Sequence, residues 1–152
     1  MSKILFVCLG NICRSPLAEG IMLHLKQKHN LKIEIDSAGT ASYHIGEAPD
    51  HRTIANAKKN GVDLSALRAR QFVADDFDAF DQIYVMDSNN HKNVLFLAKN
   101  DLQKQKVHLF LNTLFPGKNM EVPDPYYGDE KKFEEVFQLI YKACDNLLKT
   151  VL

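Results

Sequence analysis

Short apolar segments alternate along the chain with longer segments in which apolar residues recur at helical spacing. The short segments predict β-strands at residues 3–7, 32–37, 82–86 and 106–110. The periodic segments predict helices at residues 17–29, 49–60, 89–100 and 130–148. Residues 75–81 interleave four aspartates with two phenylalanines and predict a solvated helix face or turn.

This order of elements predicts an α/β fold with one four-stranded parallel sheet and helices on both of its faces. A chain of 152 residues without a linker-like segment predicts a single domain over residues 1–152. In such sheets, ligands bind beyond the carboxyl ends of the strands. Cys8 directly follows the first predicted strand, so we expect the functional site in the loop that begins there.

Three residues predict where helices begin or end. Ser15, followed by Pro16, predicts an N-cap and the first position of the first helix. Gly61 predicts the end of the second helix, because glycine readily adopts the left-handed backbone conformation found there. The first of these signals predicts that residues 8–15 connect a strand to a helix by a compact loop.

Residues 8–15 read CLGNICRS and have two interpretations, a tight turn or a loop that surrounds a tetrahedral anion. Gly10 and Asn11 tolerate left-handed backbone angles, so successive N–H groups can point inward beside the positive end of a helix. Arg14 offers a planar fork for two anion oxygens. The same positive potential stabilises a thiolate at Cys8, and Ser15 can donate a hydrogen bond to its sulfur. The preceding strand and following helix favour the anion-binding loop.

The composition narrows the classes of function. Lys plus Arg and Asp plus Glu number 19 each, so the formal charge of zero does not indicate a nucleic acid or a membrane as partner. We expect no membrane span and no signal peptide, because the apolar segments are too short. The three cysteines match neither a disulfide framework nor a zinc site, so we expect a cytoplasmic protein without a metal or other cofactor. The six scattered histidines are expected at the surface or in ordinary packing.

The stretch VCLGNICRSPLAEG, residues 7–20, resembles the phosphate-binding loop of the low molecular weight protein tyrosine phosphatases, whose signature is C-x5-R-[ST]. The similarity extends over nearly the whole chain, through DSAGT, ARQF, VMD and DPYYG. It implies a cysteine-dependent enzyme that hydrolyses phosphotyrosine in proteins. It further implies that Cys8 is the nucleophile, that Arg14 binds the phosphate, that Ser15 stabilises the thiolate and that Asn11 holds the shape of the loop.

A phosphatase that releases a phenol needs a proton donor, and the segment EVPDPYYG, residues 121–128, offers one. Two prolines stiffen the loop around Asp124, and two tyrosines supply apolar walls for an aromatic ring. An ordinary Asp-Pro turn is the alternative for this segment taken alone. In the family, DPYYG matches the loop of the general acid, which implies that role for Asp124 and cleft walls at Tyr126 and Tyr127. The resemblance also implies that Tyr43 forms the far wall of the cleft.

The remaining loop residues are expected to surround a bound phosphate or sulfate ion: Leu9, Gly10, Ile12 and Cys13. Cys13 has two interpretations, a small residue that packs beneath the loop or a resolving thiol that forms a reversible disulfide with oxidised Cys8. Cys144 lies on the apolar side of the last predicted helix, so we expect it in the core.

Polar residues at the ends of two other strands are expected to support the loop. Asp87 follows the third strand and is expected to provide a hydrogen bond rather than to act in catalysis. Asp36 and Ser37 end the second strand and are expected to brace the loop. The family often has a histidine two residues before Ala69, where this chain has Leu67, which affects local packing or the polarity of the cleft edge.

Three rival functions share the phosphate-binding loop. Protein-arginine phosphatases of the same family tend to have threonine just before the second loop cysteine, where this chain has Ile12. Arsenate reductases need extra cysteines near the third strand, and residues 83–93 contain none. A phosphate-binding module without activity would leave the joint presence of Cys8 and Asp124 unexplained. We therefore expect a phosphotyrosine protein as substrate and a monomer or weak dimer as the oligomeric state.

Overall fold

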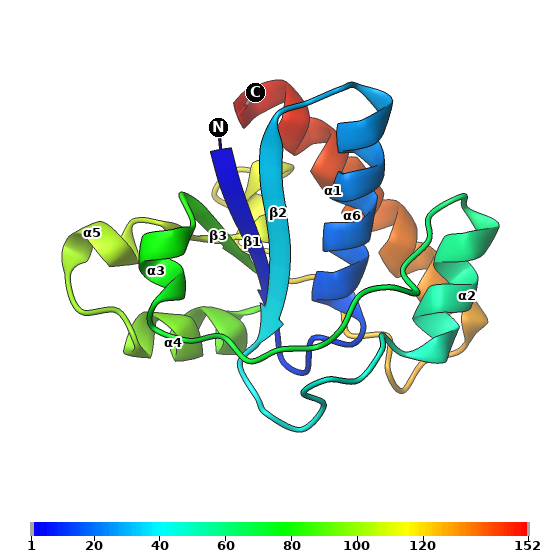
Figure 1. Ribbon diagram of the computed structural model, residues 1–152, viewed down its shortest axis with the longest axis horizontal. Helices are drawn as coiled ribbons and strands as arrows, with labels where there is room; N and C mark the ends of the chain where they lie inside the picture. The colour runs from blue at the N-terminus through cyan, green and yellow to red at the C-terminus, as the bar shows by residue number, and fades with distance from the viewer. Residues whose placement is uncertain (1, 152) are drawn as a thin grey trace.

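Four parallel strands form one sheet in the order β2-β1-β3-β4. The structure is a computed structural model that describes residues 2–151 (Figure 1). The strands are β1 (Ser2–Cys8), β2 (Ile33–Gly39), β3 (Gln82–Val85) and β4 (Val107–Leu109). The predicted α/β fold with a four-stranded parallel sheet is therefore confirmed. The domain predicted over residues 1–152 includes Met1 and Leu152, which lie outside the described residues.

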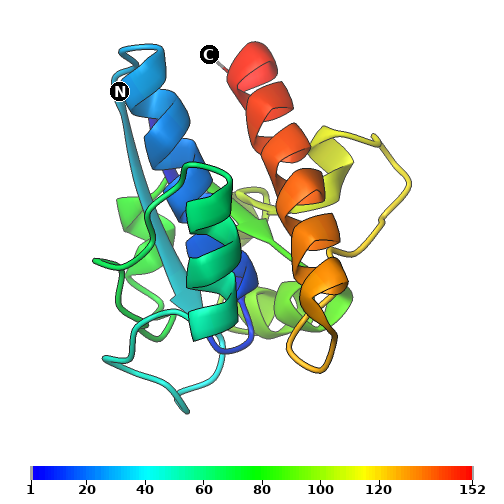
Figure 2. The same cartoon turned by 90° about the vertical axis from the view of Figure 1, so that its right-hand side faces the viewer.

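Helices cover both faces of the sheet, as predicted. They are α1 (Arg14–Lys28), α2 (His51–Lys59), α3 (Asp76–Ala79), α4 (Ser88–Phe96), α5 (Asp101–Lys104) and α6 (Glu130–Val151), with a 3-10 helix η1 (Phe110–Thr113). Helices α1 and α6 lie side by side on one face, and α2 packs against α6 (Figures 1 and 2). Helices α3, α4 and α5 lie on the opposite side of the sheet (Figure 1).

The alternation of side chains along β1 divides the core into two clusters. Ile4, Phe6 and Cys8 join the cluster that includes residues of α1 and α6. Leu5 and Val7 join the cluster that includes residues of α3 and α4. Because β1 is buried on both faces, it reads as a continuous apolar run rather than as an alternating one. Its last residue, Cys8, therefore emerges from the centre of the sheet at the carboxyl edge.

Two predicted helix boundaries are wrong. Helix α1 begins at Arg14 with Cys13 as its N-cap, so Ser15 lies inside the first turn and does not cap it. Pro16 is tolerated there because the N–H groups of the first turn have no partner within the helix. The helix predicted over residues 89–100 is α4, which ends at Phe96, and the side chain of Asn100 accepts a hydrogen bond from Gln103 N as the N-cap of the separate helix α5.

The predicted end of α2 is confirmed, whereas the solvated face predicted at residues 75–81 is partly wrong. Gly61 follows the C-cap of α2 with a φ of +83°, the left-handed conformation expected of that position. Asp76 is only 5% exposed. It is buried because its carboxylate binds the guanidinium of Arg70, a partner that the local sequence pattern does not reveal.

Candidate active site

The loop between β1 and α1 forms the floor of a cavity of about 260 Å³ at the carboxyl edge of the sheet. Ten of the residues predicted for the site line this cavity: Cys8, Leu9, Gly10, Ile12, Cys13, Arg14, Tyr43, Asp124, Tyr126 and Tyr127. Tyr43 reaches it from the segment that follows β2. Asn11 and Ser15 are buried and do not line the cavity. The structure thus brings side chains from three distant segments to one cavity.

Cys8 ends β1 and lies next to the N-terminus of α1, where the helix dipole favours negative charge. Its Sγ atom is 2.9 Å from Ser15 Oγ. Asn11 Nδ2 donates to the same Ser15 oxygen over 2.8 Å, so the Ser15 hydroxyl proton is free to point elsewhere. The nearest acceptors are Cys8 Sγ and, at 3.4 Å, the Ala38 carbonyl oxygen. The shorter distance favours donation to sulfur, which stabilises a thiolate.

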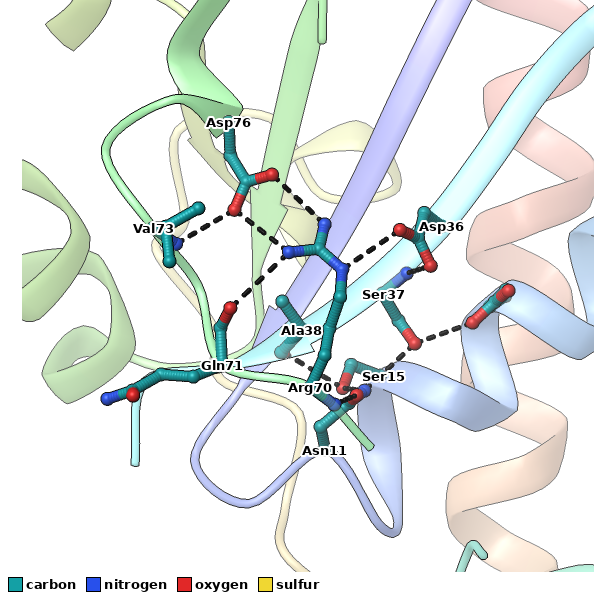
Figure 3. A network of polar contacts seen from close by, with 10 residues as sticks. Asn11, Ser15, Asp36, Ser37, Ala38, Arg70, Gln71, Val73 and Asp76 are labelled. Atoms are coloured by element: carbon teal, nitrogen blue, oxygen red, sulfur yellow. Dashed lines mark hydrogen bonds and ion pairs between the residues drawn. The ribbon is translucent and has the colours of Figure 1, made fainter. Parts of the chain in front are cut away.

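The buried side chain of Asn11 supports the phosphate loop (Figure 3). Its φ of +58° lies in the left-handed region that asparagine tolerates better than most residues. Its Nδ2 group also donates to Ser37 Oγ over 2.8 Å. Its Oδ1 atom accepts from the backbone N–H of Arg70 over 3.0 Å, which sets the orientation of the amide. The bracing role predicted for Ser37 is confirmed by these contacts.

Three carboxylates continue this network away from the cavity. Ser37 Oγ donates to Glu19 Oε1 over 2.6 Å, and burial raises the pKa of Glu19 to about 7. Arg70 donates from Nε to Asp36 and from both terminal nitrogens to the buried Asp76 (Figure 3). Asp36 therefore braces the loop through Arg70, whose backbone contacts the loop, and does not reach the loop directly.

Arg14 is buried beside Cys8 and is held by two acceptors. Its Nη1 atom donates to Asp87 Oδ2 over 2.8 Å and to the Val122 carbonyl oxygen over 3.0 Å. The other Asp87 oxygen accepts from Asn90 N at the start of α4, so Asp87 provides a hydrogen bond to the site, as predicted. Nη2 of Arg14 lies 3.7 Å from Asp124 Oδ2, so the predicted acid lies at the edge of the predicted phosphate site.

Three tyrosines stand at the mouth of the cavity. Tyr126 and Tyr127 contact each other edge to face, with ring centroids 5.0 Å apart. Tyr126 is 38% exposed and Tyr127 is 96% exposed, so the two rings differ greatly in how firmly they are packed. The Tyr126 N–H donates to Asp124 Oδ1 over 3.1 Å, which ties the acid to the backbone of its own loop. Tyr43 is exposed on the segment after β2.

Comparison with known proteins agrees with this geometry. The sequence model of the family described as "Low molecular weight phosphotyrosine protein phosphatase" matches residues 3–152. The chain belongs to this family. The low molecular weight phosphotyrosine protein phosphatase of Gallus gallus is 41% identical over 153 residues, which cover 98% of this chain and 95% of the relative.

Solved structures show the same similarity for this phosphatase-family chain. A protein tyrosine phosphatase from Entamoeba histolytica, solved with Hepes in the active site, matches with a TM-score of 0.92 and 42% identity over 99% of this chain and 97% of that one. An arginine phosphatase from Drosophila matches with a TM-score of 0.90 and 31% identity over 98% of this chain and 97% of that one.

Two residues near this phosphatase cleft are not predicted by the sequence. His44 lines the cavity, with its Nδ1 atom 2.8 Å from Glu47 Oε2, whereas the sequence predicts the histidines at the surface or in ordinary packing. Its position next to Tyr43 was the available signal. Arg52 lies over the ring of Tyr126, with Cζ 5.3 Å from the ring centroid. No local pattern pointed to Arg52, because the two rings that it covers, Tyr126 and Phe133, are far along the chain.

The cysteines of this phosphatase are free thiols in the structure. Cys13 is buried beneath the loop and lines the cavity, and its burial raises its pKa to about 12. Cys144 is fully buried in the core cluster, as predicted. Within residues 2–151 there is no group of three His, Cys, Asp or Glu side chains arranged to hold a metal ion. Within the same residues, no helix has the length and apolar character needed to span a bilayer.

Proposed function

We propose that this phosphatase hydrolyses phosphotyrosine in proteins, and aryl phosphate monoesters in general, through a cysteinyl-phosphate intermediate. The observation that carries the proposal is the convergence of Cys8, Arg14 and Asp124 on one cavity walled by tyrosines. A nucleophile, an anion-binding guanidinium and a carboxyl group are the parts that the reaction requires. Family membership supports the same chemistry.

In the first step, the Cys8 thiolate attacks phosphorus while the phosphate oxygens accept hydrogen bonds from Arg14 and the loop N–H groups. A sulfur–phosphorus bond forms as the bond from phosphorus to the phenol oxygen breaks. Asp124 gives its proton to the departing oxygen. The 3.7 Å distance between Arg14 Nη2 and Asp124 Oδ2 supports this assignment, because the carboxyl group then lies at the edge of the proposed phosphate site.

In the second step, Asp124, now a carboxylate, takes a proton from a water molecule that attacks the phosphorus of the intermediate. The sulfur–phosphorus bond breaks, inorganic phosphate is released and Cys8 leaves as a thiolate. The Ser15 hydroxyl, 2.9 Å from the sulfur, stabilises that thiolate by donating a hydrogen bond. The proposal requires no metal or other cofactor in either step.

The substrate class follows from the walls of the cleft. The rings of Tyr43, Tyr126 and Tyr127 suit the aryl group of phosphotyrosine, and the loop suits its phosphate or a sulfate ion. We also propose a cytoplasmic location, because a reducing compartment keeps thiols free and the three cysteines are unpaired. We further propose a monomer or weak dimer as the working form.

Protein-arginine phosphatase activity is the second candidate function. The similarity to an arginine phosphatase from Drosophila supports testing it. Ile12 lines the cavity and presents an apolar side chain to the group attached to phosphorus, which favours an aryl ester over a charged guanidine. Parallel turnover of phosphotyrosine and phosphoarginine distinguishes the two functions. The arsenate reductase alternative is weakened because the described thiols near the cleft are Cys8 and Cys13 alone.

The test is the turnover of an aryl phosphate by wild-type protein and three variants. Cys8→Ser should abolish turnover, and Asp124→Asn should lower kcat by about 10²–10⁴-fold, as expected when a general acid is lost. Asp129→Asn is the matched control, because Asp129 is a carboxylate of the same loop that caps α6, and asparagine preserves the cap. Full turnover by the Cys8→Ser protein would refute the proposal.

A further inference from the structure

The start of helix α2 is attached to the phosphate loop. The backbone N–H of Asp50 donates to the carbonyl oxygen of Ile12 over 2.7 Å. Asp50 is also the N-cap of α2, and its side chain accepts from Arg52 N over 2.8 Å. Asp50 therefore links the phosphate loop directly to the start of α2.

The Asp50 carboxylate holds the side chain of Arg52 in a fixed orientation. Arg52 Nε donates to Asp50 Oδ1 over 3.1 Å, and Arg52 Nη2 donates to Asp50 Oδ2 over 3.0 Å. Such a two-point contact orients the guanidinium plane as well as its position. The Asp50 side chain is only 9% exposed, so the pair is partly shielded from solvent.

The oriented guanidinium covers two aromatic rings. Arg52 Cζ lies 5.3 Å from the ring centroid of Tyr126 and 4.7 Å from that of Phe133. Both distances are within the range of a favourable cation–π contact. Tyr126 is 38% exposed, whereas its neighbour Tyr127, which has no cation over its ring among the described residues, is 96% exposed. Of the two tyrosines, Tyr126 is thus the one that is held in place.

Direct binding of an acidic substrate group by Arg52 is less consistent with the structure. Arg52 does not line the cavity that contains Cys8, and it lines the neighbouring cavity of about 300 Å³ between α2 and the start of α6. Two N–H groups of Arg52 already bind the Asp50 carboxylate, which also compensates its charge. The remaining function of this side chain is to hold its neighbours.

We infer that Arg52 is a positioning residue for the aryl group of the substrate. Held by Asp50, Arg52 fixes the ring of Tyr126 as one wall of the cleft. The hydrogen bond from Asp50 N to the Ile12 carbonyl oxygen connects this arrangement to the phosphate loop. This inference rests on the proposed function, since it concerns how the same cleft selects an aromatic ester. It predicts that Arg52 affects binding of the aryl group and leaves binding of the phosphate group unchanged.

The test separates these two parts of the substrate by kinetics. Arg52→Met substitutes an unbranched apolar side chain, which lacks both the charge and the contact with Asp50. It should raise KM for an aryl phosphate by about 3–10-fold, the size of one lost cation–π contact, with kcat changed less than about twofold. The inhibition constant of inorganic phosphate, which has no ring, should stay within about twofold of the wild-type value.

Two further variants make the result specific. Arg52→Lys keeps a cation that can reach the rings and should restore part of the lost affinity for the aryl phosphate. Lys59→Met is the matched control, because Lys59 lies on the same helix and lines the same neighbouring cavity but pairs with Glu130. Its KM should equal that of the wild type. Thermal unfolding of each variant, with bound phosphate and without it, checks that the cleft is folded.

Several outcomes would overturn the inference. An unchanged KM in Arg52→Met would show that Tyr126 needs no such support. An equal rise in KM and in the inhibition constant of phosphate would show that Arg52 acts on the phosphate loop, and a fall in kcat alone would show that it acts on the acid. Absence of turnover by the wild-type protein would reject the proposed function and this inference together, whereas the three preceding results reject the inference alone.

Discussion

Replacing Glu19 with glutamine removes an ionisable group that the fold buries behind the phosphate loop. Glu19 is 9% exposed and accepts a 2.6 Å hydrogen bond from Ser37 Oγ. Burial, the largest cause, and nearby Asp36 raise the pKa of its carboxyl group, while the Ser37 hydrogen bond and Arg70 lower it, and the net result is a rise from 4.5 to about 7. Glutamine has nearly the same shape and still offers a carbonyl oxygen to Ser37, so the variant isolates the effect of the charge.

The raised pKa defines the sign and the pH window of the effect. A carboxyl group that holds its proton more tightly in the native state than in the unfolded state stabilises the protein fully below about pH 4.5. That stabilisation is lost as the pH rises through about 7. The shift corresponds to at most about 3 kcal/mol, of which about 2.5 kcal/mol falls between pH 5 and pH 8. The free energy of unfolding of Glu19→Gln should therefore rise relative to the wild type by about 2.5 kcal/mol across this interval.

The assay is urea-induced unfolding of both proteins at several values between pH 5 and pH 8. Far-ultraviolet circular dichroism is the suitable probe, because the chain contains no tryptophan. The difference between the two proteins at each pH cancels the contributions of all other titrating groups. Glu34→Gln is the matched control, since Glu34 is exposed on β2 and loses the same charge without leaving a buried site. A difference that stays constant within about 0.5 kcal/mol from pH 5 to pH 8 would refute the reasoning.

Three further substitutions test the support of the phosphate loop. Asn11→Ala removes the amide that makes three hydrogen bonds and places alanine at a φ of +58°. It should lower the free energy of unfolding in urea by about 2–4 kcal/mol and lower kcat/KM. A loss below about 1 kcal/mol would contradict this expectation. Gly39→Ala would place a Cβ atom 2.7 Å from the Leu9 carbonyl oxygen, so the loop must shift. The value of kcat/KM for an aryl phosphate should therefore fall more than about tenfold. Wild-type kinetics would show that the loop accommodates the extra atom without loss of activity. Arg70→Met leaves the buried carboxylate of Asp76 without its cation and should lower the free energy of unfolding in urea by about 3–5 kcal/mol. Adding Asp76→Asn should recover part of this loss. If the effects of the two substitutions were simply additive, the result would argue against the ion pair.

Much of the architecture and of the chemistry was predictable from local patterns. Buried parallel strands and amphipathic helices differ in period and length, so their alternation predicted the sheet and its two helical layers. The motif from Cys8 to Ser15 lies on one continuous stretch, where strand, loop and helix N-terminus follow one another directly. Asp124 was identifiable because prolines and tyrosines surround it in the sequence. The catalytic roles of these residues stay predictions until the kinetic tests above are made.

The tertiary structure alone showed which side chains meet across long stretches of chain. Arg70 reaches Asp36 with its side chain and Asn11 Oδ1 with its backbone N–H, and Arg52 reaches the ring of Tyr126. Nothing in the neighbouring sequence of either arginine indicates these partners. Ser15 shows the same limit, because its hydroxyl bonds to Cys8 and not to the helix end that its local sequence favours. Periodicity and capping signals report interactions between residues a few positions apart, whereas the pairing of polar side chains depends on how separate elements pack. That packing is determined by the whole core, so the residues that support the site from other elements, such as Arg52 and Arg70, could be identified only from the tertiary structure.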